Sequence, residues 1–270
     1  HMAWDDDTLV IADIRNPSTR QQAYDQIRMV LAGYATSEQR VLVGFDFAYG
    51  YPQGFARAVV PQGSQPWRDV WAYLHGVIQD DQRNRNNRFE VGSRLNAQLT
   101  GGAAPFWGCP KNEQTAQLSM RKPRGTGADI FSEFRLVEQA NHAHSVWKLS
   151  YPGAVGSQVL MGLPYLYALI TEPDLQYVSK VWPFDTGLKI LGEADLAGVH
   201  ILHAEIYPSL VPVTPRDGEI KDELQVRALA QYIADQDYQG CLARLFAGRR
   251  PLSDDERVTV ETEEGWILGI

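Results

Sequence analysis

The chain has 270 residues, of which 44% are apolar and 21% charged, ordinary values for a globular protein with one sizeable core. No run of about 18 apolar residues occurs, which excludes a membrane-spanning helix in this sequence. The net charge of -8 argues against a protein that coats nucleic acid without sequence preference. Cys109 and Cys241 lack a CxxC spacing, which favours a reducing compartment. We therefore expect a cytoplasmic protein with no membrane partner.

The N-terminal part of the chain predicts two strands separated by a helix. TLVIADI at 8–14 has the composition of a strand, and the turn-forming NPSTR follows it. Ser18 or Thr19 is the expected N-cap of a helix near 19–34. RVLVGFDF at 40–47 is nearly all apolar, as in a strand that is buried on both faces of a parallel or mixed sheet.

The middle of the chain predicts a helix-rich insertion. Periodicity and the Gly/Pro content divide it into a helical part at 65–100, an irregular part at 101–128 and a second helical part at 131–139. Between Arg83 and Lys148 the chain carries ten Lys or Arg against five Asp or Glu. We define 60–145 as a basic insertion within a single domain 1–270. It is either a solvated surface of mixed charge or a flap that brings an anionic substrate to an acidic site.

The final part of the chain returns to alternating strands and helices. The expected elements are a strand, glycine turn and helix within 145–170, strands at 180–184 and 198–208, a helix at 220–236 and a closing helix after the N-cap Ser253. Strands at both ends of the chain around a helical middle predict an α/β fold.

Acidic side chains follow the apolar strands at positions where carboxylates would converge. Asp46 ends the strand at 40–47, Glu205 ends the strand at 198–208, and Asp222 lies in the first turn of the next helix. Neighbouring strands lie about 4.8 Å apart, so acids at their carboxyl ends can share a divalent cation. Such an ion can activate water and stabilise the leaving oxygen in phosphodiester cleavage.

Each of these acids also has a structural explanation that the sequence leaves open. Asp46 can cap the aromatic turn that follows it, and Glu205 can pair with a buried Arg or Lys. Asp222 can complement the N-terminus of its own helix. Glu263 and Glu264 are most simply a solvated pair, although an acid on a closing helix can also supply a last metal ligand.

A series of motifs spans nearly the whole chain: GFDFAYGYP, VWKL, GAVGSQVLMGLPYL, VWPFDTG, AEIYPSL, KDELQVRALA and EEGWILG. Their order resembles an uncharacterised bacterial family whose members are labelled cobalamin biosynthesis protein CbiG-like or molybdopterin-guanine dinucleotide synthesis-like. That family is in turn similar to proteins with a ribonuclease H-like fold. The resemblance implies a mixed sheet of the ribonuclease H type, with Asp46, Glu205 and either Asp222 or Glu264 where that superfamily keeps acidic ligands.

The chain departs from this family at its start. Such proteins open with a first strand that carries an Asp-Trp-Ser stretch, followed by a Lys-containing hairpin, whereas this chain begins AWDDDTLVIADI. In the superfamily the first-strand Asp is usually the central metal ligand, and that strand is absent or shortened here. Asp5, Asp6 or Asp7 can substitute for it, or they form a solvated acidic tail.

Cationic and glycine-rich segments supply candidate contacts to an anionic substrate. Lys122 and Arg124 lie beside flexible glycine in RKPRGTG, and Arg135 and Lys148 extend the positive charge of the insertion. Ser157 lies in YPGAVGSQ, at a helix N-terminus that suits a phosphate. The alternatives are an exposed loop for RKPRGTG and a plain tight turn, capped by Ser157, for YPGAVGSQ.

We expect a ribonuclease H-like phosphodiesterase or nuclease that depends on Mg²⁺ or Mn²⁺ and acts on nucleic acid or a nucleotide. Asp46, Glu205 and Asp222 are the expected catalytic residues, and Glu264 is expected to complete the metal ligands. One alternative is a non-catalytic binding module for a small anion or a protein partner. Another is a cobalamin or tetrapyrrole-pathway protein, as the family label suggests. His203 shares a strand face with Glu205, and a buried neutral histidine is favoured there over a metal ligand.

Overall fold

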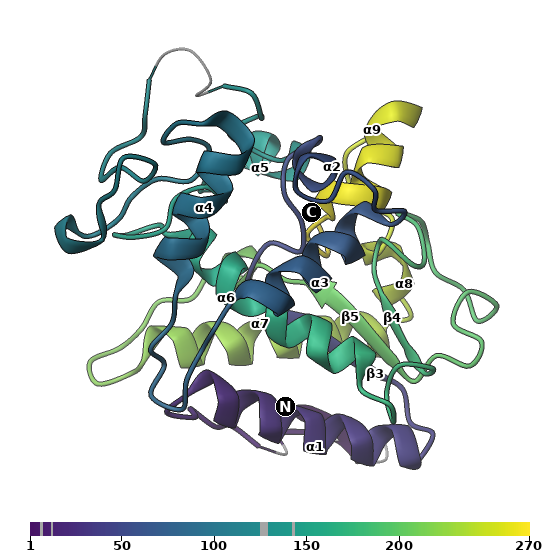
Figure 1. Cartoon of the computed structure of the whole chain (residues 1–270). Helices are drawn as coiled ribbons and strands as arrows, with labels where there is room; N and C mark the ends of the chain where they lie inside the picture. The colour runs from purple at the N-terminus through teal and green to yellow at the C-terminus, as the bar shows by residue number, and fades with distance from the viewer. Residues whose placement is uncertain (6–7, 12, 125–128, 142–143) are drawn as a thin grey trace.

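A computed structural model describes the chain except for residues 6–7, 12, 125–128 and 142–143. Its N-terminal half contains β1 (Met2–Asp5), β2 (Thr8–Ile11), α1 (Arg20–Thr36), β3 (Val41–Phe45), α2 (Phe55–Val59), α3 (Pro66–Val77), α4 (Arg88–Thr100) and the 3₁₀ turn η1 (Lys111–Glu113) (Figure 1). Its C-terminal half contains α5 (Leu136–Asn141), α6 (Val155–Thr171), β4 (Ser179–Val181), β5 (Ile201–Glu205), η2 (Pro208–Leu210), α7 (Lys221–Tyr238), α8 (Leu242–Leu245), α9 (Asp254–Thr259) and the π-helical turn η3 (Val260–Glu264).

A small parallel sheet lies at the centre of the molecule. Its strand order is β3-β5-β4, with β5 in the middle. Val41 to Phe45 pair in register with Ile201 to Glu205, so the carboxyl ends of β3 and β5 lie side by side. β1 and β2 form a separate antiparallel hairpin. The α/β class is confirmed, and Glu205 lies beside the strand that leads into Asp46.

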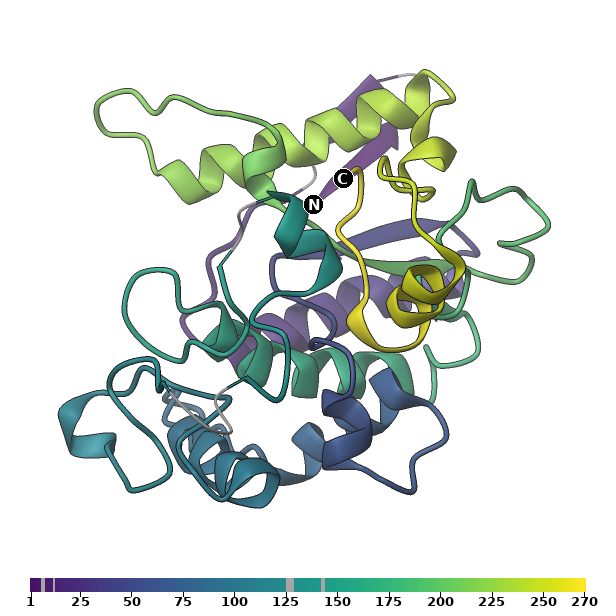
Figure 2. The same ribbon diagram turned by 90° about the horizontal axis from the view of Figure 1, so that it is seen from above.

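Helices cover both faces of the parallel sheet. Figure 2 shows α7 on one side of it and α1 and α6 on the other. On the α1 and α6 side, Ile201 packs with Leu31 and Leu169. On the opposite side, Leu202 and Ala204 pack with the C-terminal segment, α8 and α7. The alternation of side chains along β5 therefore places its residues in two different hydrophobic clusters, one on each face of the sheet.

The largest core is aromatic and joins the turn after β3 to the insertion. The Tyr51 ring stacks on Trp147 with centroids 5.3 Å apart. The Phe55 ring meets Phe106 edge-on at 5.9 Å. These residues belong to one cluster with α3, α4 and α6. Residues of the insertion at 60–145 thus share a core with α6, and Tyr49, Tyr51 and Phe55 of the turn after β3 are buried in that core.

The N-cap residues that the sequence indicated lie at the observed start of two helices. α1 begins after Thr19, whose side chain accepts a hydrogen bond from the Gln22 amide. α9 begins after Ser253, which forms a capping box with Glu256. The closing helix continues for one turn as the π-helical η3, which the sequence did not indicate.

Strands were predicted less accurately than helices. The expected strand at 8–14 is the shorter β2, and its hairpin partner β1 was not predicted. Residues 145–150 form no strand, and within the described part of the chain their ladder contact is an isolated bridge between Trp107 and Lys148. The backbone there is held by packing against α6 and by the loop that contains Trp107.

The turn after β3 passes directly over η3 at Gly50. A Cβ atom at this position would lie 2.1 Å from the Glu263 carbonyl oxygen and 2.6 Å from that of Glu264. Backbone atoms cannot yield as a flexible side chain does. Gly50→Ala should therefore lower the free energy of unfolding by about 3 kcal/mol, measured by urea denaturation.

Gly33→Ala is the matched control for Gly50→Ala. Gly33 is an exposed position within α1, and no heavy atom of the described residues lies within 4 Å of the place that a Cβ atom would take there. The alanine should raise the free energy of unfolding by roughly 0.5–1 kcal/mol because it restricts the unfolded chain. Equal effects of the two substitutions would contradict the close approach at Gly50.

In the described part of the chain, no helix combines the length and the apolar composition that a membrane span requires.

Candidate functional site at the carboxyl end of the sheet

Asp46 follows the last residue of β3 and is solvent-exposed. It forms no hydrogen bond or ion pair with any residue that the structure describes. Partial loss of hydration raises the pKa of Asp46, and repulsion by the nearby Asp222 carboxylate raises it further. Asp46 therefore does not cap its own turn, and its charge has no cationic partner in the described residues.

Asp222 reaches the same region from the first turn of α7. Asp222, Leu229 and Ile233 are seven and four residues apart and so share one face of the helix. Leu229 is buried and Ile233 packs on the core below the sheet. This face points Asp222 toward the sheet, which explains its electrostatic contact with Asp46.

Glu205 ends β5 and is buried, with 3% of its surface exposed. Its two carboxylate oxygens accept hydrogen bonds from Arg135 at 2.6 and 2.8 Å. One of them also accepts the Tyr49 amide at 2.9 Å. Glu205 was expected to ligate metal, and the structure shows instead the alternative left open by the sequence, a pair with a buried Arg. This pair fixes the start of the turn after β3 through the Tyr49 amide.

Arg135 is the cation of this network and is buried, with 1% of its surface exposed. It donates through Nε to Glu138 at 2.9 Å and through Nη1 to the Glu264 carbonyl oxygen at 2.8 Å. The nearby carboxylates raise the pKa of Arg135 although burial opposes them, so the side chain stays charged. Its depth and its complete pairing correct the expectation that Arg135 contacts substrate.

Glu263 and Glu264 bind the aromatic turn through its backbone amides. Glu264 accepts from the Gln53 amide at 2.9 Å and from the Leu136 amide at 2.6 Å. Glu263 accepts from the Ala56 amide at 2.7 Å. Burial raises the pKa of both carboxyls, and the amides oppose that rise. They are buried anchors of the turn, which corrects the expectation of a solvated pair.

The four carboxylates expected to ligate metal therefore divide into two kinds. Glu205 and Glu264 are occupied by Arg135 and by amides, whereas Asp46 and Asp222 have no such partners among the residues that the structure describes. Within the described residues no group of three or more His, Cys, Asp or Glu is arranged to hold a metal ion. Of the four expected metal ligands, Asp46 and Asp222 therefore remain as candidates. Of the three acids considered as substitutes for a first-strand Asp, Asp6 and Asp7 lie outside the described residues and Asp5 is the last residue of β1.

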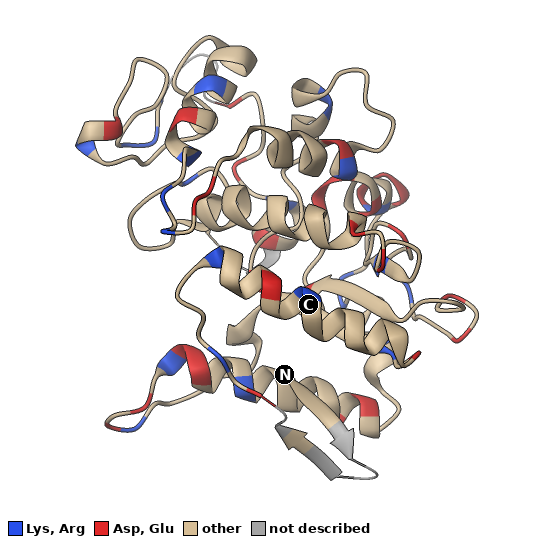
Figure 3. Cartoon of the chain, turned by 60° about the horizontal axis from the view of Figure 1, so that its bottom comes forward, with Lys and Arg blue, Asp and Glu red and all other residues tan. Residues whose placement is uncertain are grey.

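The expected substrate contacts are distributed over the insertion and the start of α6. Lys122 pairs with Glu133 at 2.5 Å, and Arg124 is exposed without an ion pair to a described residue. The Lys148 ammonium donates to the Pro152 carbonyl at 2.5 Å. The Ser157 hydroxyl donates to the Leu149 carbonyl and accepts from Arg88 at 2.9 Å. Figure 3 shows acidic residues among the basic ones here, and Arg124 alone of these four has no hydrogen-bonding partner among described residues.

Glu138 belongs to the buried network, although the sequence did not single it out. Arg135 and Glu138 are three residues apart on a segment with helical periodicity, which is a recognisable pairing signal. The same spacing is common on exposed helices, so it carries no information about burial. The partner across the sheet, Glu205, is 70 residues away and has no local signal at all.

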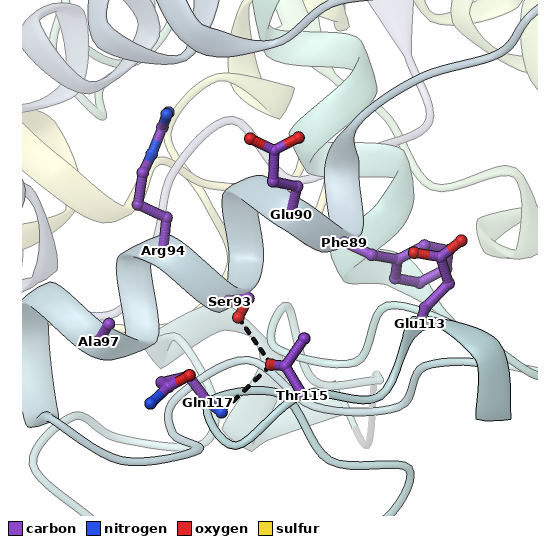
Figure 4. Close-up of a pocket in the computed structure, with 8 residues that line it drawn as sticks. All are labelled: Phe89, Glu90, Ser93, Arg94, Ala97, Glu113, Thr115 and Gln117. Atoms are coloured by element: carbon purple, nitrogen blue, oxygen red, sulfur yellow. Dashed lines mark hydrogen bonds between the residues drawn. The ribbon is translucent and has the colours of Figure 1, made fainter.

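Two surface hollows lie apart from Asp46 and Asp222. One, of about 340 Å³, lies between α4 and residues 113–117, where the Ser93 and Thr115 hydroxyls are 2.8 Å apart (Figure 4). The other, of about 560 Å³, lies beside α7 and includes Leu224 and Gln231, on the face of the helix opposite Asp222. None of the expected site residues lines either hollow.

No family model matches this chain, and neither a curated protein nor a solved structure matches it significantly. The likeness to the CbiG-like family and to the ribonuclease H-like fold stays a prediction from the sequence motifs.

Proposed function

We propose that this protein holds a divalent cation, Mg²⁺ or Mn²⁺, between Asp46 and Asp222 and hydrolyses a phosphate ester of a nucleic acid or nucleotide, as a ribonuclease H-like enzyme. The observation that carries the proposal is the unpaired carboxylate pair at the carboxyl end of β3. The Asp222 carboxylate repels that of Asp46, and Asp46 has no cationic partner among the described residues, so a shared positive charge would relieve this repulsion.

The number of free carboxylates fits one hydrated ion. Mg²⁺ is commonly held by one or two carboxylates, with water and substrate phosphate completing its octahedron. Asp46 and Asp222 are both exposed, so such an ion and its phosphate ligand would have access from solvent. A bound ion of this kind supplies an activated water and charge neutralisation at the phosphoryl oxygens.

The buried network contributes by holding Asp46 in place. Arg135 fixes Glu205, and Glu205 fixes the Tyr49 amide three residues after Asp46. Glu264 fixes the same turn further along at Gln53. Glu205 and Glu264 are therefore positioning residues in this proposal, and the ligand role is limited to Asp46 and Asp222.

Removing either free carboxylate should weaken cation binding. We expect Asp46→Asn and Asp222→Asn each to reduce Mn²⁺ affinity by roughly tenfold or more, as measured by electron paramagnetic resonance of free Mn²⁺. Affinity in the unmodified protein should fall as pH falls through the raised pKa of Asp46, because the ligand must be deprotonated. Asp25→Asn, at an exposed carboxylate of α1, is the control and should leave binding unchanged.

Hydrolysis is tested with labelled single- and double-stranded RNA and DNA and with a chromogenic phosphodiester, in Mg²⁺ or Mn²⁺. Metal-dependent cleavage that is lost in Asp46→Asn and kept in Asp25→Asn supports the proposal. Mn²⁺ binding that is the same in Asp46→Asn, Asp222→Asn and the unmodified protein contradicts it.

A non-catalytic binding module is the second candidate. The observation in its favour is that Glu205 and Glu264, half of the expected ligands, are saturated by Arg135 and amides. This candidate predicts a calorimetric response to a small anion such as inorganic phosphate and no response to Mg²⁺ or Mn²⁺. No observation in the described part of the structure favours a tetrapyrrole pathway, which stays a prediction from the family label.

A further inference from the structure

β3 forms an open edge of the parallel sheet. It pairs with β5 on one side and has no strand partner on its other side in the described part of the chain. The Val41 amide donates to the His200 carbonyl oxygen at 2.7 Å, so Val41 directs its backbone groups toward β5. Backbone groups alternate in direction along a strand, and those of Leu42 and Gly44 therefore point toward the open edge. They form no hydrogen bond with a described residue, and Gly44 is exposed.

β3 also lacks the features that usually protect the edge of a sheet. Its sequence is VLVGF, with no charged residue and no proline, and it pairs with β5 without a bulge. The unpaired N–H and C=O groups of such an edge can continue the ladder with a further strand. An extended strand is therefore the kind of partner that fits here.

The sequence around β3 is complementary to a second copy of itself. When two β3 strands pair antiparallel about Val43, Leu42 of each copy lies opposite Gly44 of the other. The N–H and C=O groups that point outward from the two strands then bond one another. The same register brings Arg40, just before β3, to Asp46 of the second copy, just after it. Opposite charges across two strands stabilise their pairing, and a shifted register would lose these contacts.

The two charged side chains are accessible for this contact. Asp46 is exposed and has no cationic partner among the described residues. Arg40 pairs with Glu193 at 2.7 Å, but 48% and 84% of these side chains are exposed. An ion pair that is so accessible to water contributes little. Arg40 can therefore exchange Glu193 for Asp46 of a second copy at small cost.

We propose that the open edge of β3 is a homodimer surface, at which two chains join their sheets through antiparallel β3 strands related by a two-fold axis. Arg40 of each copy then pairs with Asp46 of the other. The pairing goes beyond the proposed function and needs no divalent cation. Because it competes with a cation for Asp46, association is measured in the presence of EDTA.

Sedimentation equilibrium of the full chain tests the pairing, with dimers expected in the unmodified protein at roughly 0.1 mM. Arg40→Asp and Asp46→Arg each place like charges opposite each other, and each should weaken association roughly tenfold or more. An equimolar mixture of these two variants should form dimers again. The first variant presents only acidic groups at the two positions and the second only basic ones, so both contacts between unlike copies are attractive.

Arg83→Asp is the matched control. It makes the same change of charge at an exposed position between α3 and α4 and should leave association unchanged. Hydrogen exchange reports on the strands themselves, because pairing protects amides that otherwise face water. The Leu42 and Gly44 amides should exchange more slowly as the concentration of the unmodified protein or of Arg83→Asp rises, and should not do so in Arg40→Asp.

Dimers in the unmodified protein and in the mixture, but in neither single variant alone, support the proposal. An unmodified protein that stays monomeric overturns it and leaves a strand of another protein as the occupant of the edge. Dimers that persist in both single variants, a mixture that stays monomeric, or exchange at Leu42 and Gly44 that is independent of concentration also overturn it. A charge-dependent dimer of a protein that binds no Mn²⁺ leaves this proposal standing while the Asp46 and Asp222 cation site fails.

Discussion

Glu205→Gln should lower the free energy of unfolding by about 3–5 kcal/mol, because it leaves the buried guanidinium of Arg135 without its bidentate partner. Glutamine has the shape of glutamate but presents an NH₂ group where Arg135 needs an acceptor. Glu138 remains as the single carboxylate that contacts Arg135 among the described residues. The loss would be a large share of the roughly 5–15 kcal/mol that typical domains have in total.

Urea denaturation at neutral pH, followed by tryptophan fluorescence, measures this effect. Asp222→Asn is the matched control, since it removes an exposed carboxylate and should change the free energy of unfolding by no more than about 0.5 kcal/mol. A loss below about 1 kcal/mol for Glu205→Gln would show that water reaches the pair and screens it as at a surface.

The double variant Arg135→Ala with Glu205→Gln tests whether the two side chains stabilise the fold through their contact with each other. Two contacting residues of one network should not have additive effects, so the double variant should lose less than the sum of the single losses. Additive losses would mean that Arg135 and Glu205 stabilise the fold independently, for example each through its own backbone contacts.

The sequence predicted helices and the class of the fold because those properties are local. The apolar positions of α1 and α7 and the N-cap of α1 lie within their own segments, so these helices are specified by local sequence. β5 was likewise recognisable as a run of apolar residues that ends in Glu205. The hairpin partner β1 has four residues and ends at the start of the acidic run Asp5–Asp7, so it is too short to give a strand signal of its own.

The candidate site was predictable only in part, because its partners are distant along the chain. The sequence identified Asp46, Glu205 and Asp222 as acids at the ends of elements, and Asp46 and Asp222 do lie near each other. It could not show that Arg135, in the helical part predicted at 131–139, would extend to the carboxyl end of β5 and pair with Glu205. The direction of the long Arg135 side chain therefore determines which carboxylates have a cationic partner.

His203 is the second residue for which we expect a large effect, and its effect depends on pH. The side chain is fully buried in β5 between Val43 and Val181 of the neighbouring strands. Neither ring nitrogen has a hydrogen-bond partner among the described residues. Burial lowers the pKa of His203 to about 3, which confirms the expectation of a buried neutral histidine.

The sign of the pH effect depends on which state of the protein, folded or unfolded, protonates His203 at the higher pH. The unfolded chain takes up a proton near the ordinary histidine pKa of 6.5, whereas the folded protein does so only near 3. The stability linked to His203 is therefore present above about pH 6.5 and is lost as pH falls toward 3. At about 1.4 kcal/mol per pKa unit, the loss amounts to roughly 4 kcal/mol by about pH 3.5.

His203→Leu should remove this acid sensitivity. Leucine fills a similar volume and has no nitrogen to leave unpaired, so the variant should be at least as stable as the unmodified protein at about pH 7. The difference between the two proteins should then grow as pH falls, to roughly 4 kcal/mol near pH 3.5 in urea denaturation. Glu263 and Glu264, whose raised pKa values favour the folded state at lower pH, are common to both chains and cancel in the difference. Parallel pH profiles for the two proteins would mean that folded His203 gains a proton as readily as the unfolded chain, and that its nitrogens are hydrated.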